Sequence, residues 1–436
     1  MLNYFSRYKS LPQFFEEKPN ENVGIIVVIP CYDDDFIFQT LESLNVAEKP
    51  NCDVEVIVVV NSAENTDISI VNKNREVFDK LKKHCHCGLD PQSLNTNRLD
   101  SQAIAGQARN DKGYFFNILP ILIENVPKKI AGVGNARKTG MDEAVRRFAA
   151  IDKNNGIIVS LDSDCLVAKN YFTEIEKYFI NNSKSDCCTI NFQHNFDKNL
   201  YSEQEIYACQ LYETYLRYFR LSLAATGFPY CFHTIGSCFA VKALCYTKLG
   251  GMARLQAGED FYFLHKAAQA TTVGRIDEKI VFPAPRISDR VLFGTGKAIQ
   301  KIIENEHYKV YNFELFLILK SFFEIFEQIF ETKTINLIII PQEIINFLTE
   351  KKLLEIFNET ITNTKHKEQF IKRLYSKFDA FFVIRFLNYF NKSELFPPNE
   401  LFEEIKKMFD CYKIFVNNFS HKNIYITMCD LDMRKK

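Results

Sequence analysis

Three short runs of apolar, largely β-branched residues place the tightest constraint on the fold of this chain. The runs are residues 23–29, 54–60 and 157–161. Runs of this length and composition are typical of strands that are buried on both faces, as in a parallel sheet. The segments between them carry helical periodicity, as in residues 36–44 and 136–148. Alternating strands and helices predict an α/β fold with a mostly parallel sheet flanked by helices.

Each of these runs is followed by polar residues. They are residues 31–35 after the first run, residues 61–62 after the second and residues 162–164 after the third. Parallel strands end at the same edge of a sheet, and ligands of such sheets bind beyond the carboxyl ends of the strands. We therefore expect the functional site at this edge.

Residues 84–112 interrupt the alternation. They are polar, rich in Gly, Asn and Gln, and have no apolar period. The segment resembles a translated mobile repeat element of the kind seen in some bacterial genomes, and we interpret it as an in-frame insertion that forms an exposed, disordered loop. The residues on either side, 71–83 and 114–124, are predicted to be helical.

Beyond residue 301 the pattern changes to long amphipathic segments broken by Asn, Thr, Lys and Pro. This pattern predicts helices whose aromatic stripes form a core. The segments are residues 311–331, 342–357, 367–389 and 400–415. The sequence thus predicts an N-terminal extension (1–22), an α/β domain (23–300) and a helical C-terminal domain (301–436).

Charge and cysteine usage narrow the classes of partner. Lys plus Arg equals Asp plus Glu at 54 each, so no net charge favours nucleic acid or an anionic membrane. The 13 cysteines have no repeating spacing and the N-terminus lacks a secretory signal, which favours reduced thiols in the cytoplasm. The most apolar C-terminal stretches, 315–319 and 337–340, are far shorter than the roughly 18 residues of a spanning helix. Peripheral contact with the inner face of a membrane stays open.

The strongest local signal is a pair of carboxylates at the end of the third run. Asp162 and Asp164 are two residues apart, so in extended backbone both side chains point to the same side. Both can then approach one divalent cation, and hard oxygen ligands suit Mg²⁺ or Mn²⁺. A turn with an Asx cap would also use Asp at this place, so the pair alone leaves both readings open.

Two further segments supply a positively charged side chain, Arg137, and a third carboxylate, Asp260. Arg137 follows Gly132 and Gly134 at the start of a predicted helix, where backbone N–H groups and a guanidinium could hold a nucleotide. The alternative there is a Gly turn with an exposed Arg. Asp260 begins another predicted helix, where it is either an N-cap or a base for an acceptor hydroxyl.

Together these motifs resemble family 2 glycosyltransferases of the GT-A fold. In order they read VVIPCYDDD, VVVNS, AGVGNARKTG, IIVSLDSDC, HTIGSCFAVKALCYTKLGGM and AGEDFYF, over about residues 23–280. The resemblance implies that Asp260 is the catalytic base and that Asp164, with Asp162, holds the metal-bound diphosphate. It implies that the nucleotide sugar is bound by Pro30, Tyr32, Asp34, Asn61, Arg137, Asp162 and Asp164.

The chain departs from the family pattern in two respects. The second strand of the family usually ends in Asp, whereas this chain has Asn61, which leaves the choice of nucleobase between UDP- and GDP-sugars open. The Gln-x-x-Arg-Trp motif of processive members is absent, which argues against a polysaccharide synthase. Residues 286–290 form a candidate loop in which Arg290 closes over the leaving diphosphate, although a basic surface loop would have the same sequence.

The expected activity is therefore metal-dependent, inverting transfer of a sugar from a nucleotide donor to a hydroxyl of a glycan, lipid-linked or other acceptor. Two alternatives remain at this stage. One is a non-catalytic sugar-nucleotide-binding protein, and the other is a sugar nucleotidyltransferase. The second is disfavoured because residues 31–35 are acidic and lack the Gly-rich basic loop that such enzymes usually place after the first strand.

Overall fold

The computed structural model describes residues 1, 3–8, 10–84, 102–105, 113–287, 294–305 and 307–434. Contacts divide the chain into two compact units. Unit 1 comprises Met1–Asp197 and Thr234–Lys297, and unit 2 comprises Lys198–His233 and Ala298–Lys436. Residues 198–233, which precede the last strands of unit 1 in sequence, thus belong with the C-terminal helices.

Unit 1 is built on one sheet whose strands, in the described residues, run in the order β3-β4-β2-β1-β5-β8-β7-β9-β6. The half formed by β4, β2, β1 and β5 is parallel. The strands of this half are β1 (Val23–Cys31), β2 (Asp53–Ala63), β4 (Asn117–Val126) and β5 (Ile157–Ser160). The others are β3 (Gln102–Ala105), β6 (Cys165–Val167), β7 (Cys187–Phe192), β8 (Phe239–Lys242) and β9 (Val273–Pro283).

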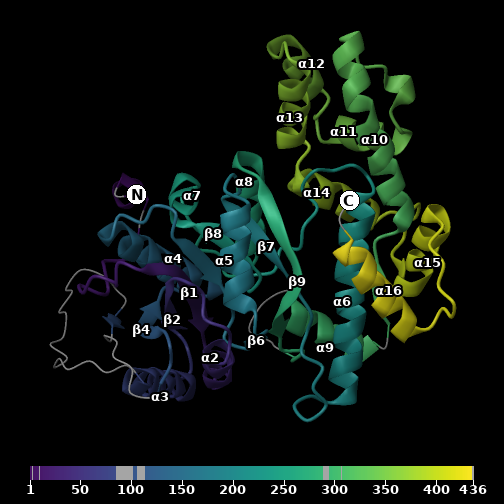
Figure 1. The fold of residues 1–436 in the computed structure, drawn as a ribbon. Helices are drawn as coiled ribbons and strands as arrows, with labels where there is room; N and C mark the ends of the chain where they lie inside the picture. Colours follow the sequence, from purple (N-terminus) through teal and green to yellow (C-terminus); the bar gives the residue numbers. More distant parts are fainter. Residues whose placement is uncertain are drawn as a thin grey trace. The chain divides into compact units, whose positions relative to one another are not determined.

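Helices cover both faces of the parallel half. In Figure 1, α3 lies below these strands and α4 above them, and both helices contact them. A Cβ at Gly140 would lie 2.4 Å from Val28 Cγ1, so glycine allows α4 to pack closely on the sheet. The helices of unit 1 are α1 (Asn3–Arg7), α2 (Ile37–Asn45), α3 (Ile68–His84), α4 (Val133–Ala150), α5 (Tyr171–Asn181), α7 (Ala243–Lys248) and α8 (Glu259–Ala270).

The structure confirms the predicted α/β class, the parallel central strands and the helical C-terminal region. The three apolar runs form β1, β2 and β5. Of residues 36–44, all but the N-cap residue 36 lie in α2, and residues 71–83 and 136–148 lie in α3 and α4. Of the predicted insertion, Gln102–Ala105 form β3, which pairs antiparallel with β4. Residues 85–101 and 106–112 of the insertion lie outside the described residues.

The predicted helix at residues 114–124 is wrong, because this segment enters strand β4 at Asn117. Residues 118–124 of the strand are all buried, between β2 on one side and β3 on the other. A strand that is buried on both faces is apolar at nearly every position. It therefore lacks the alternation of apolar and polar residues that distinguishes a strand from a helix in the sequence. Pro120, which disfavours a helix interior, was the available signal.

Unit 2 is helical. Phe322 of α10 lies 5.2–6.0 Å from the rings of Phe326, Phe357, Phe378 and Phe382, as expected if the aromatic stripes form a core. The elements are α6 (Glu203–Ala224), α10 (Phe313–Thr332), η1 (Leu337–Ile339), α11 (Gln342–Glu350), α12 (Glu355–Asn363), α13 (Lys367–Lys377), α14 (Ala380–Phe390), α15 (Leu401–Tyr412), α16 (His421–Met433) and the ribbon of β10 (Lys309–Val310) with β11 (Asn399–Glu400). Helix α9 (Thr295–Asn305) begins in unit 1 and continues into unit 2.

Two of the predicted C-terminal helices are each divided in two. Residues 342–357 contain all of α11 and the start of α12, and residues 367–389 contain α13 and most of α14. The second break falls at Asp379, whose side chain accepts a hydrogen bond from the Phe382 N–H at 2.9 Å and so caps α14. Within the part of the chain that the structure describes, no helix is both long and apolar enough to span a membrane.

Candidate active site

The candidate site lies at the carboxyl ends of the parallel strands β1, β2 and β5. Strand β1 is in register with both neighbours, with Cys31 opposite Val60 and Val28 opposite Ser160. The three polar segments that follow these strands therefore meet at one edge of the sheet. Pro30 is buried within β1 and Tyr32 and Asp34 follow it, Asn61 lies in β2, and Asp162 and Asp164 lie in the turn between β5 and β6.

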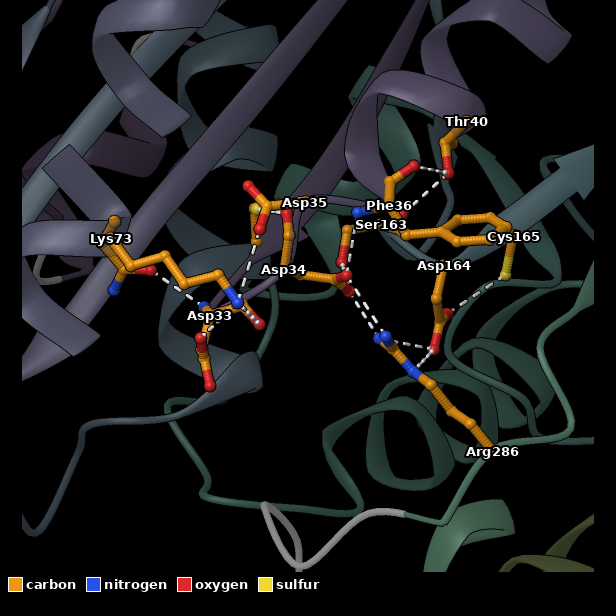
Figure 2. A network of polar contacts seen from close by, with 12 residues as sticks. Asp33, Asp34, Asp35, Phe36, Thr40, Lys73, Ser163, Asp164, Cys165 and Arg286 are labelled. Atoms are coloured by element: carbon orange, nitrogen blue, oxygen red, sulfur yellow. Dashed lines mark hydrogen bonds and ion pairs between the residues drawn. The ribbon is translucent and has the colours of Figure 1, made fainter. Parts of the chain in front are cut away.

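Asp34 and Asp164 are joined by an arginine from a distant part of the chain (Figure 2). Arg286, just after β9, donates from Nη1 to Asp34 Oδ1 at 3.2 Å and from Nε to Asp164 Oδ2 at 3.0 Å. Its Nη2 also donates to Asp34 Oδ2. Burial alone would lower the pKa of the Arg286 guanidinium, but the charges of Asp164 and Asp34 raise it above the ordinary value. The bridge ties the loop after β1 to the turn after β5.

Asp34 is also held by hydrogen bonds from residues other than Arg286. Its Oδ2 accepts a hydrogen bond from Ser163 Oγ at 2.8 Å, and its Oδ1 accepts one from the Phe36 N–H at 3.1 Å. Thr40 of α2 donates to the Ser163 carbonyl oxygen at 2.7 Å. The side chain of Asp34 is 3% exposed, so this carboxylate is a buried part of the site.

Helix α3 holds the first turn after β1. Asp33 has a φ of 50°, in the left-handed region that non-glycine residues rarely adopt. Its N–H donates to Asn74 Oδ1 at 2.8 Å, and its carboxylate lies 2.8 Å from Lys73 Nζ (Figure 2). These two contacts of α3 stabilise the strained turn and so set the position of Asp34.

Arg137 forms a second, deeper ion network. This residue of α4 is 2% exposed, and its guanidinium donates to Glu259 from Nη1 and to Asp162 from Nη2. Burial alone would lower the pKa of Arg137, but the charges of Asp162 and Glu259 raise it above the ordinary value. A Cβ at Gly236 would lie 2.5 Å from Arg137 Nη2, so only glycine leaves room for the guanidinium. The network orients Asp162, whose side chain remains 35% exposed.

Asp260 is the second residue of α8, which begins at Glu259, so the N-cap position belongs to Gly258 and not to Asp260. Gly258 precedes the helix with a φ of 76°. Burial raises the pKa of the Asp260 carboxyl, the adjacent Glu259 carboxylate raises it further and Arg137 lowers it, with the net result of a pKa of about 6. A carboxylate with a pKa near neutrality, half-buried beside an ion network, has the properties of a general base.

The remaining site residues of the sequence analysis have different outcomes. Asn61 is 4% exposed and donates from Nδ2 to the Gly132 carbonyl oxygen at 3.2 Å, so it links β2 to the turn before α4. Arg290 lies outside the described residues. Arg286, four residues earlier in the same loop, is the arginine that the structure brings to the carboxylates.

The donor set at this edge fits a divalent cation. Mg²⁺ is commonly held by one or two carboxylates with the rest of its shell supplied by phosphates and water. Asp162 and Asp164 offer two hard oxygen donors, with side chains 35% and 24% exposed. Among the described residues no group of three or more His, Cys, Asp or Glu side chains could form a cation site made of protein alone. The other ligands of a cation on these two carboxylates would come from water or from a bound molecule.

Sequence reasoning missed the partners that position the site. Glu259 carries the ion pair with Arg137, and Lys73 and Asn74 hold the turn after β1. Glu259 adjoins Asp260 in the motif, which was an available signal. Residues 73–74 lie within an ordinary helical pattern and gave none.

No protein-family model matches this chain. No curated protein matches it either. Solved structures that resemble it include residues 1–349 of S. aureus TarS, at 13% identity and a TM-score of 0.35, over 60% of each chain, so this chain spans less than two thirds of that structure. The same TarS fragment in complex with UDP-GlcNAc matches at 11% identity and a TM-score of 0.38, over 81% of this chain and 90% of that one. A mannosyltransferase from Pyrobaculum calidifontis, in complex with GDP-Man and Mn²⁺, matches at 12% identity and a TM-score of 0.34, over 99% and 93%.

Proposed function

We propose that this chain is a glycosyltransferase, similar to family 2 enzymes of the GT-A fold, that moves a sugar from a nucleotide donor to an acceptor hydroxyl. One observation carries the proposal: Asp260, with a pKa of about 6, interacts electrostatically with Arg137 and Asp162 at the carboxyl edge of the sheet. This position supports a role for Asp260 as a base near carboxylates that could hold a cation bound to the donor diphosphate. The order of sequence motifs over residues 23–280 supports the same function.

In the proposed reaction, Asp260 takes the proton of the acceptor hydroxyl while the hydroxyl oxygen forms a bond to the anomeric carbon of the donor. The bond from that carbon to the diphosphate oxygen breaks, and its electron pair leaves with the nucleoside diphosphate. Attack opposite the leaving group inverts the anomeric centre. Asp162 and Asp164 would hold Mg²⁺ or Mn²⁺, which when bound offsets the charge on the diphosphate.

The other proposed contacts follow from position. Pro30 lies in β1, Asn61 lies in β2, and Tyr32 and Asp34 follow β1. We assign these residues to the nucleoside part of a UDP- or GDP-sugar. Arg290 is assigned to the leaving diphosphate. The proposed acceptor is a glycan, a lipid-linked sugar or another hydroxyl compound, used in the cytoplasm or at the inner face of a membrane.

The function is tested with a panel of UDP- and GDP-sugars, each with and without Mn²⁺. A donor that binds only the native state raises the melting temperature. We expect one donor class to stabilise the protein in a Mn²⁺-dependent manner and to release nucleoside diphosphate when a suitable acceptor is added. Binding without turnover against any acceptor would instead identify a sugar-nucleotide-binding protein.

The assignment of Asp164 predicts the effect of removing its carboxylate. In Asp164→Ala, Mn²⁺ should no longer increase the affinity for the donor, measured by titration calorimetry, because a hard oxygen ligand is lost. The fold should persist, since the side chain is partly exposed at the end of a turn. Asp53→Ala, at the exposed amino end of β2, is the control and should keep the Mn²⁺ effect. Unchanged Mn²⁺ dependence in Asp164→Ala would show that the metal is held elsewhere.

The raised pKa of Asp260 predicts the pH profile of transfer. A base must be deprotonated, so kcat/KM should fall about tenfold per pH unit as the pH drops below about 6. Glu259→Gln removes the neighbouring negative charge that raises the pKa of Asp260, so the acid limb should move to lower pH in this variant. An acid limb that stays in place in Glu259→Gln would indicate that another group controls it.

A further inference from the structure

Arg286 binds two carboxylates, Asp34 and Asp164, that differ in their exposure to solvent (Figure 2). Asp34 is 3% exposed and also accepts hydrogen bonds from Ser163 Oγ at 2.8 Å and from the Phe36 N–H at 3.1 Å. The side chain of Asp164 is 24% exposed, and its Oδ2 accepts a hydrogen bond from Arg286 Nε at 3.0 Å and lies 3.0 Å from Nη2 of the same guanidinium. The Asp34 carboxylate is thus buried and held by further hydrogen bonds, whereas the Asp164 carboxylate is partly exposed to solvent.

The Asp164 carboxylate has two competing uses. The lone pairs and negative charge of a carboxylate attract both a divalent cation and the N–H groups of a guanidinium. Two cations on one oxygen also repel each other. A cation on Asp164 therefore competes with the Nε hydrogen bond and the Nη2 ion pair of Arg286. The hydrogen bonds of Nη1 and Nη2 to the buried Asp34 can remain.

We propose that Arg286 is an exchangeable counterion: it stays anchored on Asp34 and gives up Asp164 when a divalent cation and a diphosphate bind together. The proposal rests on the proposed function for its diphosphate. A cation that binds alone breaks the ion pair between Arg286 and Asp164, and the guanidinium then has no new anion in place of Asp164. A diphosphate supplies that anion, so cation and diphosphate bind cooperatively and neither binds well alone. Such coupling is reciprocal and is typically worth about 5- to 150-fold in affinity.

The test measures Mn²⁺ binding without any nucleotide, by titration calorimetry on wild type and Arg286→Gln. We expect Arg286→Gln to bind Mn²⁺ at least about fivefold more tightly, because its competitor for Asp164 is gone. Arg75→Gln is the matched control. This half-exposed arginine of unit 1 pairs with Glu124 at 2.7 Å, and its replacement should leave Mn²⁺ affinity unchanged. Thermal melts establish that each variant is folded.

A second measurement compares the same two proteins in the presence of a nucleoside diphosphate. In wild type, UDP or GDP should increase Mn²⁺ affinity at least about fivefold, and the increase should be smaller in Arg286→Gln, because only the direct contacts between the diphosphate and the cation remain. Equal or weaker Mn²⁺ binding by Arg286→Gln, or absence of Mn²⁺ binding by both proteins, would overturn the proposal. Because the Mn²⁺ titration uses no sugar donor, tighter binding by Arg286→Gln would support the exchange even if no transfer were detected with any acceptor.

Discussion

Asp260→Asn should transfer sugar at least about a hundred times more slowly than wild type while binding the donor within a few-fold. Loss of a general base typically costs about a hundred- to ten-thousand-fold in rate. Asparagine keeps the size of the side chain and most of its ability to accept a hydrogen bond at the start of α8, so the helix should be preserved. Steady-state release of nucleoside diphosphate and donor titration calorimetry measure the two quantities separately.

The control for this variant is Asp277→Asn in β9. Asp277 lies 3.5 Å from Arg275 and is 29% exposed, so its replacement removes one carboxylate of unit 1 away from the site. Its transfer rate should stay within a few-fold of wild type. Near-normal transfer by Asp260→Asn would remove this residue as the base and direct attention to Glu259 or to a retaining mechanism.

The sequence sufficed for the parts of the fold that depend on local pattern. Strands β1, β2 and β5 are apolar runs with clear polar ends, and α8 starts at an acidic turn preceded by glycine. Strand β4 was mistaken for a helix because burial on both faces removes the period that distinguishes the two. The sheet order, with β8 and β7 inserted beyond β5, depends on contacts far apart in sequence, which no local pattern encodes.

The residues of the candidate site also fall into those that the sequence could predict and those that it could not. Residues that end strands, such as Asp34 and Asp162, could be proposed from position alone because parallel strands share an edge. The ionic partners could not, because Arg137 meets Glu259 across 122 residues of chain and Arg286 meets Asp34 across 252. Arg290, the arginine proposed from the sequence, lies outside the described residues, and only the path of the chain after β9 shows that Arg286 reaches the carboxylates.

Arg137→Met should destabilise unit 1 by about 3–5 kcal/mol, the cost expected when one partner of a buried ion network is removed. Arg137 and Glu259 are each 2% exposed, so the variant leaves the Glu259 carboxylate buried without its cation. Asp162 is 35% exposed and can recover hydration, so Glu259 carries most of the penalty. Denaturant unfolding followed by circular dichroism measures the change. Lys177→Met removes a cation that is 62% exposed, from a pair with Glu174, and should cost no more than about 1 kcal/mol.

A double variant separates the charge from the shape of the Arg137 side chain. Arg137→Met with Glu259→Gln removes both buried charges of this pair while keeping similar volumes, so neither charge of the pair is left buried without its partner. The double variant should therefore regain at least half of the stability that Arg137→Met loses. If the double variant is as unstable as Arg137→Met, the loss comes from packing around the guanidinium against Gly236, and the ion network does not stabilise the site. If it is restored, Arg137 acts as the buried counterion that holds Glu259 and Asp162 in place beside Asp260.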